Sequence, residues 1–135
     1  MFTFFGLFVD PASHLTTDIC EIWPDLKPIR IERPISAIAL RFGFQTYQDE
    51  RDDVPEEIVR LTETLSAKNP ALRFLLLRTE CFGGDCVNWG LIFQDGKIAF
   101  RAEGKEALRR LIGYWGVEIG HEEIFDPLRR DFVWD

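Results

Sequence analysis

Two stretches of the chain are apolar at nearly every position, and a β-strand of that kind needs cover on both of its faces. The first covers residues 2–9, whose large side chains would alternate across an extended strand, with Phe5, Leu7 and Val9 on one side and Phe2, Phe4 and Phe8 on the other. The second covers residues 71–79, which include an almost unbroken run of Leu and Phe. We expect the second to be a central strand of a sheet, and the first to be either a central strand or a strand capped by the chain end.

The dipeptide Asp95-Gly96 predicts a hairpin with a type I′ turn between residues 87–93 and 97–101. In the predicted register Gln94 lies opposite Lys97, Phe93 opposite Ile98 and Leu91 opposite Phe100. Trp89 and Val87 would extend this apolar stripe. The other face of the hairpin is expected to be mostly exposed to solvent, and it holds Asn88, Gly90, Gln94, Lys97 and Arg101.

Apolar residues at helical spacing predict two main helices. One begins after Asp53, which can cap it, and ends at Asn69-Pro70; the other covers residues 105–115 and ends before Gly116. Shorter helices are expected within 13–23 and 121–128, an edge strand at 29–32 and a further strand at 35–44. The order of the elements predicts one α+β domain over residues 1–135, with an antiparallel or mixed sheet packed by two main helices.

The composition is that of a folded domain, because 46% of the 135 residues are hydrophobic and 29% are charged. The apolar N-terminal run is short and no basic segment precedes it, so neither a signal peptide nor a membrane span is expected. Cys20, Cys81 and Cys86 are an odd number of cysteines, which favours reduced thiols over a disulfide framework. Together these features predict a cytoplasmic location.

The formal net charge of −7 argues against nucleic-acid binding, which needs a basic face. Much of the negative charge lies in residues 49–57, where the single Arg51 is outnumbered by Asp49, Glu50, Asp52, Asp53, Glu56 and Glu57. Two interpretations stay open. This acidic segment could dock a basic protein by long-range attraction, or it could be a solvated loop that leads into a normally charged first helical turn.

The most unusual segment is a loop with two glycines between two thiols. Its candidate site residues are Glu80, Cys81, Phe82, Gly83, Gly84, Asp85, Cys86, Asn88 and Trp89. One interpretation is a ligand site in which the loop presents backbone N–H groups beside the acids and thiols. The simpler one is a hairpin whose glycines supply positive φ. The spacing of Cys81 and Cys86 also allows a labile redox disulfide.

No catalytic or cofactor motif is present, and neither a cofactor nor a metal is predicted. The two histidines, His14 and His121, have no partner at metal-ligand spacing. The chain lacks the glycine-rich phosphate and dinucleotide loops and the nucleophile elbow of hydrolases. A Cys86–His121 dyad stays possible because catalytic partners meet in space rather than in sequence. An enzyme is therefore the less favoured class.

The second half of the chain resembles a group of small uncharacterised bacterial proteins, some of them suspected immunity proteins of secreted toxins. The resemblance is carried by residues 79–84, Asn88, Gly90, the Asp95-Gly96 turn, residues 108–111 and Phe125-Asp126, within roughly residues 75–134. The chain departs from that group at Cys81, where an aromatic residue is usual, and at Asn88, where Gln is usual. The resemblance implies a cytoplasmic binder and no catalytic residues.

We therefore carry two hypotheses forward. The first is a non-catalytic cytoplasmic protein-binding domain, in the form of an immunity-type inhibitor whose acidic segment covers a basic toxin. The alternative is an enzyme or small-ligand-binding protein that uses the loop between Cys81 and Cys86. The oligomeric state is not predicted.

Overall fold

The computed structural model describes residues 2–43, 55–82 and 85–119, with three helices and six strands among them. Along the chain these elements are β1 (Phe2–Val9), α1 (Leu15–Ile22), β2 (Ile29–Ile31), β3 (Ala37–Arg41), α2 (Glu56–Lys68), β4 (Phe74–Phe82), β5 (Asp85–Gln94), β6 (Lys97–Gly104) and α3 (Ala107–Gly113). The predicted helix at 121–128 lies outside the described residues.

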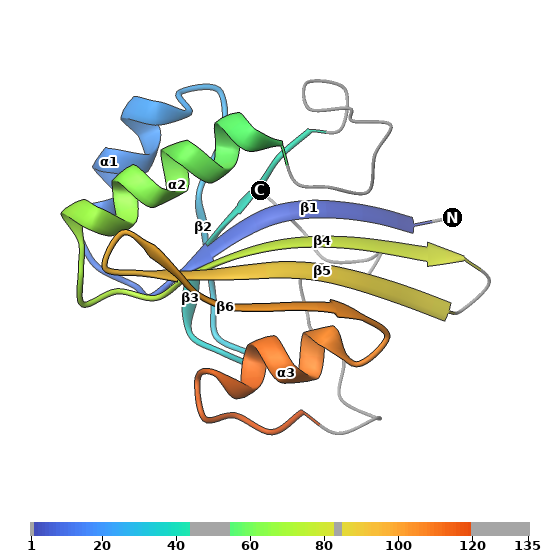
Figure 1. Cartoon of the computed structure of the whole chain (residues 1–135). Coiled ribbons are helices and arrows are strands. Elements are labelled where there is room, and N and C mark those ends of the chain that lie inside the picture. The colour runs from blue at the N-terminus through green and yellow to red at the C-terminus, as the bar shows by residue number, and fades with distance from the viewer. Residues whose placement is uncertain (1, 44–54, 83–84, 120–135) are drawn as a thin grey trace.

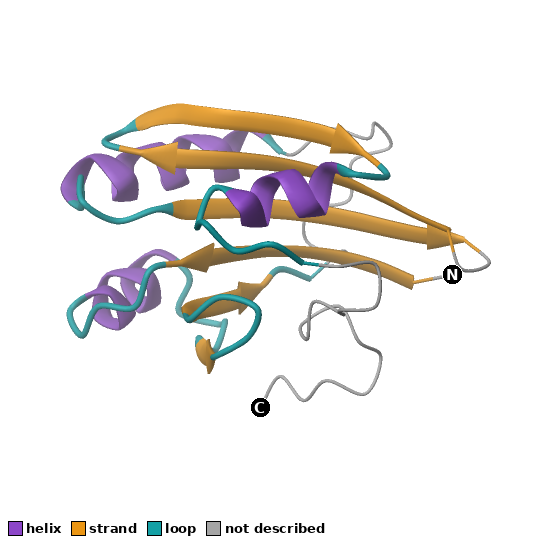
Figure 2. Ribbon diagram, turned by 90° about the horizontal axis from the view of Figure 1, so that it is seen from below, coloured by secondary structure: helices purple, strands orange, loops and turns teal. Residues whose placement is uncertain are grey.

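The strands form one antiparallel sheet in the order β2-β3-β1-β4-β5-β6. Both apolar strands therefore lie in the middle of the sheet, and β2 lies at an edge, as the sequence predicts. Figures 1 and 2 show α1 and α2 on one face of the sheet and α3 on the other. The fold is α+β, and the sheet is antiparallel rather than mixed.

The alternation of β1 supplies both cores. Phe5, Leu7 and Val9 pack in the layer under α1 and α2, and Phe4 and Phe8 pack in the layer under α3. All five are at most 3% exposed. A strand buried on both faces needs apolar residues at even and odd positions alike, which explains its sequence.

The helices begin and end close to the predicted positions. At α2 the N-cap position is Pro55, and Glu56 and Glu57 occupy the first turn, where the positive end of the helix dipole favours them. Asp53, the predicted cap, lies outside the described residues. The helix predicted at 105–115 is shorter, covering Ala107–Gly113, and Gly116 follows it with a φ of 73°.

The predicted hairpin forms, but part of its register is wrong. Gln94 pairs with Lys97 and Phe93 with Ile98 as expected, whereas Phe100 pairs with Ile92 instead of Leu91. The cause is a β-bulge after Ile98, which inserts one residue into β6 and moves every later side chain to the other face.

The face of the hairpin that was expected to be wet is partly buried. Asn88 is 4% exposed, and Gly90 lies under α3, where an added Cβ would meet Leu111 side-chain atoms. The prediction failed there because α3 folds back over β5 and β6. Glycine at position 90 admits this close approach.

Candidate functional site

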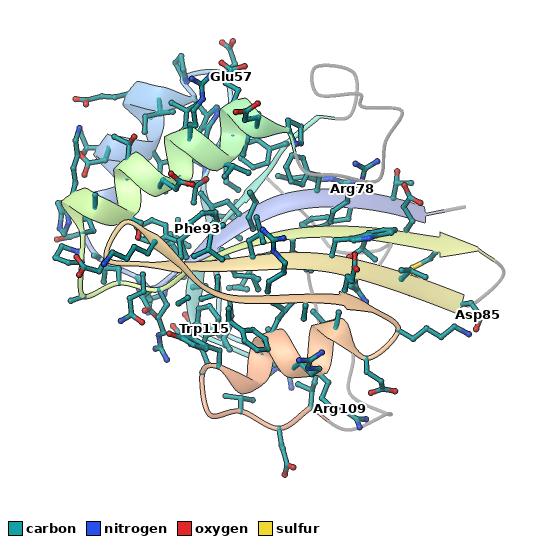
Figure 3. The ribbon with its side chains drawn as sticks, in the orientation of Figure 1. Glu57, Arg78, Asp85, Phe93, Arg109 and Trp115 are labelled. Atoms are coloured by element: carbon teal, nitrogen blue, oxygen red, sulfur yellow. A yellow bond between two sulfur atoms is a disulfide. The ribbon has the colours of Figure 1, made fainter. Side chains whose placement is uncertain are left out.

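Alternation along β4 and β5 divides the loop residues of the sequence analysis between the two faces of the sheet. Cys81, Cys86 and Asn88 lie on the face covered by α3, and Glu80 and Trp89 lie on the face of α1 and α2. Asp85 is exposed at the end of the hairpin, visible in Figure 3. The Phe82 side chain, Gly83 and Gly84 lie outside what the structure describes. The described residues of this loop therefore do not converge on one site.

The expectation of three reduced thiols is wrong for two of them. Cys81 and Cys86 are directly opposite in the β4–β5 register and form a disulfide, whereas Cys20 is a free cysteine exposed on α1. The antiparallel pairing of β4 with β5 on either side of the loop agrees with the hairpin interpretation, while the φ angles expected of Gly83 and Gly84 lie outside the described residues. The odd number of cysteines does not indicate this bond. The disulfide forms because Cys81 and Cys86 lie directly opposite each other on paired strands.

Asn88, a candidate ligand-binding residue, has an internal role instead. Its Oδ1 accepts a hydrogen bond of 2.6 Å from the hydroxyl of Thr79, the residue directly opposite on β4. Both side chains are buried, at 4% and 1% exposure. The pair fixes the register of β4 against β5 two residues along each strand from the disulfide.

A buried charge on β4 was missed by sequence reasoning. Arg78 is 7% exposed and lies opposite Trp89, on the face of the sheet covered by α1 and α2. Its Nη2 is 3.4 Å from Glu80 Oε1. In Figure 3, Arg78 lies beyond the first turn of α2. A cationic residue inside an apolar strand is the signal that could have singled it out.

Four acidic residues, two near the end of α1 and two at the start of α2, lie at one end of the layer formed by these helices. α1 and α2 run in opposite directions (Figure 1), and His14 Nε2 at the start of α1 lies 2.6 Å from Asn69 Oδ1 at the end of α2. The last turn of α1 therefore lies at the same end as the first turn of α2. We call this region the acidic end, defined by four exposed carboxylates: Glu21, Asp25, Glu56 and Glu57.

The acidic end includes two residues of the predicted acidic segment, Glu56 and Glu57, and adds two from another part of the chain. Asp49, Glu50, Asp52 and Asp53 lie outside the described residues, so of that segment only Glu56 and Glu57 are placed. Helix electrostatics explains these two but not Glu21, which is in the last turn of α1, where a negative charge opposes the dipole and no basic residue offsets it. Compensation of the α2 dipole therefore does not account for all four carboxylates of the acidic end.

A shallow hollow of about 290 Å³ lies beside the acidic end, lined by Leu26, Lys27, Arg41, Phe42 and Gly43. Phe42 makes an edge contact, with ring centroids 5.2 Å apart, to Trp23, which is 5% exposed. The Trp23 indole N–H has no hydrogen-bond acceptor among the described residues. A buried donor without an acceptor is costly and uncommon in native proteins.

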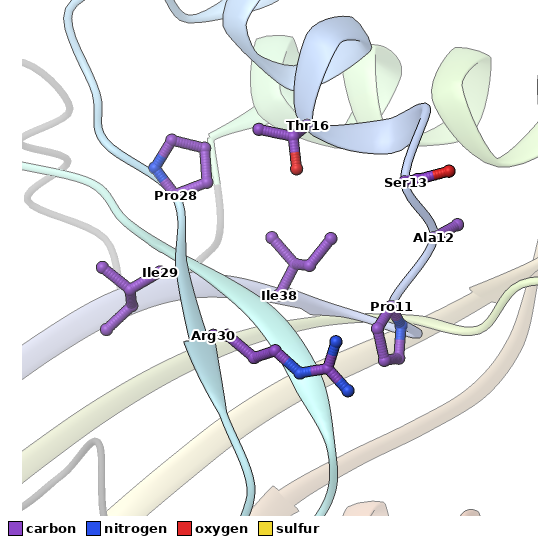
Figure 4. A pocket seen from close by; sticks show the side chains of 8 residues that line it. All are labelled: Pro11, Ala12, Ser13, Thr16, Pro28, Ile29, Arg30 and Ile38. Carbon is purple, nitrogen blue, oxygen red and sulfur yellow. The ribbon is translucent and has the colours of Figure 1, made fainter.

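A second hollow, of about 480 Å³, lies between the start of α1 and the β2–β3 edge (Figure 4). Its lining is mainly apolar, with Pro11, Pro28, Ile29 and Ile38, and its one charged group, Arg30, is bound to Glu32 at 2.9 Å. With its cation already paired at an exposed site, this hollow offers little that would orient a polar ligand.

Among the described residues, Asp10 is the ionisable group whose pKa is clearly shifted, and its contacts hold the fold together. Burial by itself raises the pKa of Asp10, but hydrogen bonds from the side chain and backbone of Arg73 and from Trp115, with the positive charge of Arg73, bring it below the ordinary value of 3.8. These bonds measure 2.8 to 3.0 Å. Both oxygens of the carboxylate accept hydrogen bonds, so its role is to hold distant segments together rather than to react.

Among the described residues, no group of three or more His, Cys, Asp or Glu side chains could hold a metal ion, and none of the described helices is long and apolar enough to cross a membrane. His121, the proposed partner of Cys86, lies outside the described residues. Comparison of the chain with protein-family models, curated proteins and solved structures found no match.

Proposed function

We propose that this protein is a protein-binding domain that docks a basic partner at the acidic end. The observation that carries the proposal is the antiparallel arrangement of α1 and α2, which places Glu21 and Asp25 at the same end as Glu56 and Glu57. Four exposed carboxylates so grouped produce a local negative field that attracts cations and speeds encounter with a basic surface.

The hollow beside the acidic end supports the same proposal. Phe42 and Leu26 in this hollow offer apolar contact to a partner. Lys27 and Arg41 also line the hollow, so the attraction for a basic partner comes from the carboxylates of the acidic end and not from the hollow itself.

Within this class we propose an immunity-type inhibitor that covers the basic surface of a toxin, as the sequence resemblance implies. The sequence predicts a cytoplasmic location, but the Cys81–Cys86 disulfide weighs against it because the cytosol keeps most thiols reduced, so the proposal does not include a location. The alternative, a ligand site at the loop between Cys81 and Cys86, has less support because Asn88 is buried against Thr79 and Glu80 is paired with Arg78.

The test is affinity capture from a lysate of the native host with three immobilised proteins: the parent and two variants of equal net charge. The acidic-end variant combines Glu21→Gln, Asp25→Asn and Glu57→Gln. The control variant combines Glu106→Gln, Asp85→Asn and Glu118→Gln, which are also exposed. We expect the parent and the control to retain the same basic protein and the acidic-end variant to lose it. Equal retention by all three proteins would contradict the proposal.

A further inference from the structure

The strand β6 is the long edge of the sheet. It pairs with β5 on one side only, and Figure 2 shows no described element beyond it. α2 approaches the hairpin turn before β6, where the Gly96 N–H donates a hydrogen bond of 3.0 Å to the Ser66 hydroxyl. Among the described residues, no strand pairs with the outer edge of β6 after the bulge, from Phe100 to Gly104. An edge of this kind is a template for another strand.

The register shows which backbone groups face outward. In a two-residue hairpin the pair next to the turn, here Gln94 and Lys97, is hydrogen-bonded, and pairs then alternate along the ladder. Phe100, Ala102 and Gly104 therefore direct their backbone groups toward β5. Arg101 and Glu103 direct theirs away from it, into solvent.

The side chains of these same two residues have opposite charges. Arg101 and Glu103 are both exposed, and neither makes an ion pair with any described residue. Opposite them on β5 are Leu91 and Trp89, so both point to the face of α1 and α2. The edge thus carries a positive and a negative side chain two residues apart on one face.

We propose that β6 pairs with the β6 of a second copy of this chain, antiparallel and centred on Ala102. This arrangement sets Arg101 opposite the second copy's residue at position 103 and Glu103 opposite its residue at position 101. Both pairs consist of residues with outward backbone groups, so each forms two backbone hydrogen bonds and one ion pair. Centres on Arg101 or Glu103 place like charges opposite each other, and a centre between two residues sets outward-facing backbone groups against inward-facing ones.

A second observation is that exposed apolar side chains lie near β6, on both faces of the sheet. The exposed large hydrophobic residues of the described chain are Ile98, at 40%, and Tyr114, at 36%. Ile98 belongs to β6, and the Tyr114 ring stacks on Phe100 of β6 with centroids 6.3 Å apart. The contact area of a single strand pair is small, so we expect a weak dimer that dissociates on dilution.

Sedimentation equilibrium at 0.15 M salt tests the pairing over a range of protein concentrations. We expect the parent to dimerise, and Arg101→Glu or Glu103→Arg alone to weaken the dimer by at least about ten-fold, because each change makes two like-charge contacts across the two-fold axis. The double variant Arg101→Glu/Glu103→Arg restores opposite charges and should return the dissociation constant to within about three-fold of the parent.

A backbone test separates strand pairing from other charge contacts. Glu103→Pro removes an N–H that faces solvent in the monomer, so we expect a folded monomer. Circular dichroism verifies the fold of every variant. A parent that stays monomeric at the highest concentration, or a dimer unaffected by Glu103→Pro, would overturn the proposal, as would a charge-swapped double variant no better than the single ones.

Discussion

The indole N–H of Trp115 donates a hydrogen bond of 3.0 Å to the carboxylate of Asp10, joining residues 105 positions apart. Arg73 completes the contact: its guanidinium binds the same carboxylate and lies 4.9 Å from the centroid of the Trp115 ring. The carboxylate therefore ties the end of β1 to the start of β4 and to the turn after α3. One side chain therefore joins the two central strands to the turn after α3.

This contact predicts a pH-dependent contribution to stability. The pKa of Asp10 is below its ordinary value of 3.8, so its contribution is fully present above about pH 5 and is lost as the pH falls through the lower pKa of the folded protein. We expect Asp10→Asn to cost about 2 kcal/mol at pH 7. Urea unfolding of parent and variant from pH 7 to pH 2 measures this, and their difference should shrink below pH 4. A difference independent of pH would show that the Asp10 charge does not stabilise the fold.

The disulfide predicts one free thiol, on Cys20, in the native protein. Cys81→Ser, Cys86→Ser and the double variant should each remain folded, because the buried Thr79–Asn88 hydrogen bond still fixes the register. Each should lose about 2 kcal/mol, the entropy of closing so short a loop. Cys20→Ser, at an exposed site, is the control and should have no effect. Three free thiols by titration without denaturant would instead confirm the reduced state expected from the cysteine count.

The Asp95-Gly96 turn predicts a strong dependence on glycine at position 96. Its φ is 75°, and a Cβ there would lie 3.0 Å from the Cβ of Ala67. Gly96→Val should therefore destabilise the protein by more than about 1 kcal/mol. The matched control, Lys97→Val, puts the same side chain at an exposed strand position and should cost much less. Equal urea midpoints for the two variants would be inconsistent with the turn.

The elements that sequence patterns predicted well are those set by local chemistry. Near-continuous apolar runs indicated a central strand for β4 and, as one of two alternatives, for β1, and Asp95-Gly96 located the hairpin, because both signals depend on residues close in sequence. The bulge after Ile98 and the burial of Asn88 could not be read in this way. The burial of Asn88 depends on how α3 folds back over β5 and β6, which is a tertiary event, and no turn residue or sequence pattern marks the bulge.

The candidate site shows the same division. Glu56 and Glu57 were identified from a run of acidic residues, whereas Glu21 and Asp25 joined them only when α1 and α2 were placed antiparallel. A linear search for charge runs cannot find residues that meet through packing. The described residues of the loop between Cys81 and Cys86 do not converge on one site, because residues that are neighbours along a strand point to opposite faces of the sheet.

Docking at the acidic end is tested most directly by association kinetics with the captured basic protein. Surface plasmon resonance gives the association and dissociation rates of the parent, the acidic-end variant and the control variant at several ionic strengths. We predict that at low salt the acidic-end variant associates about ten-fold more slowly than the parent, while its dissociation rate changes by less than about three-fold, and that the difference fades as salt rises. The control should match the parent. Equal association rates for all three proteins at low salt would contradict docking at the acidic end.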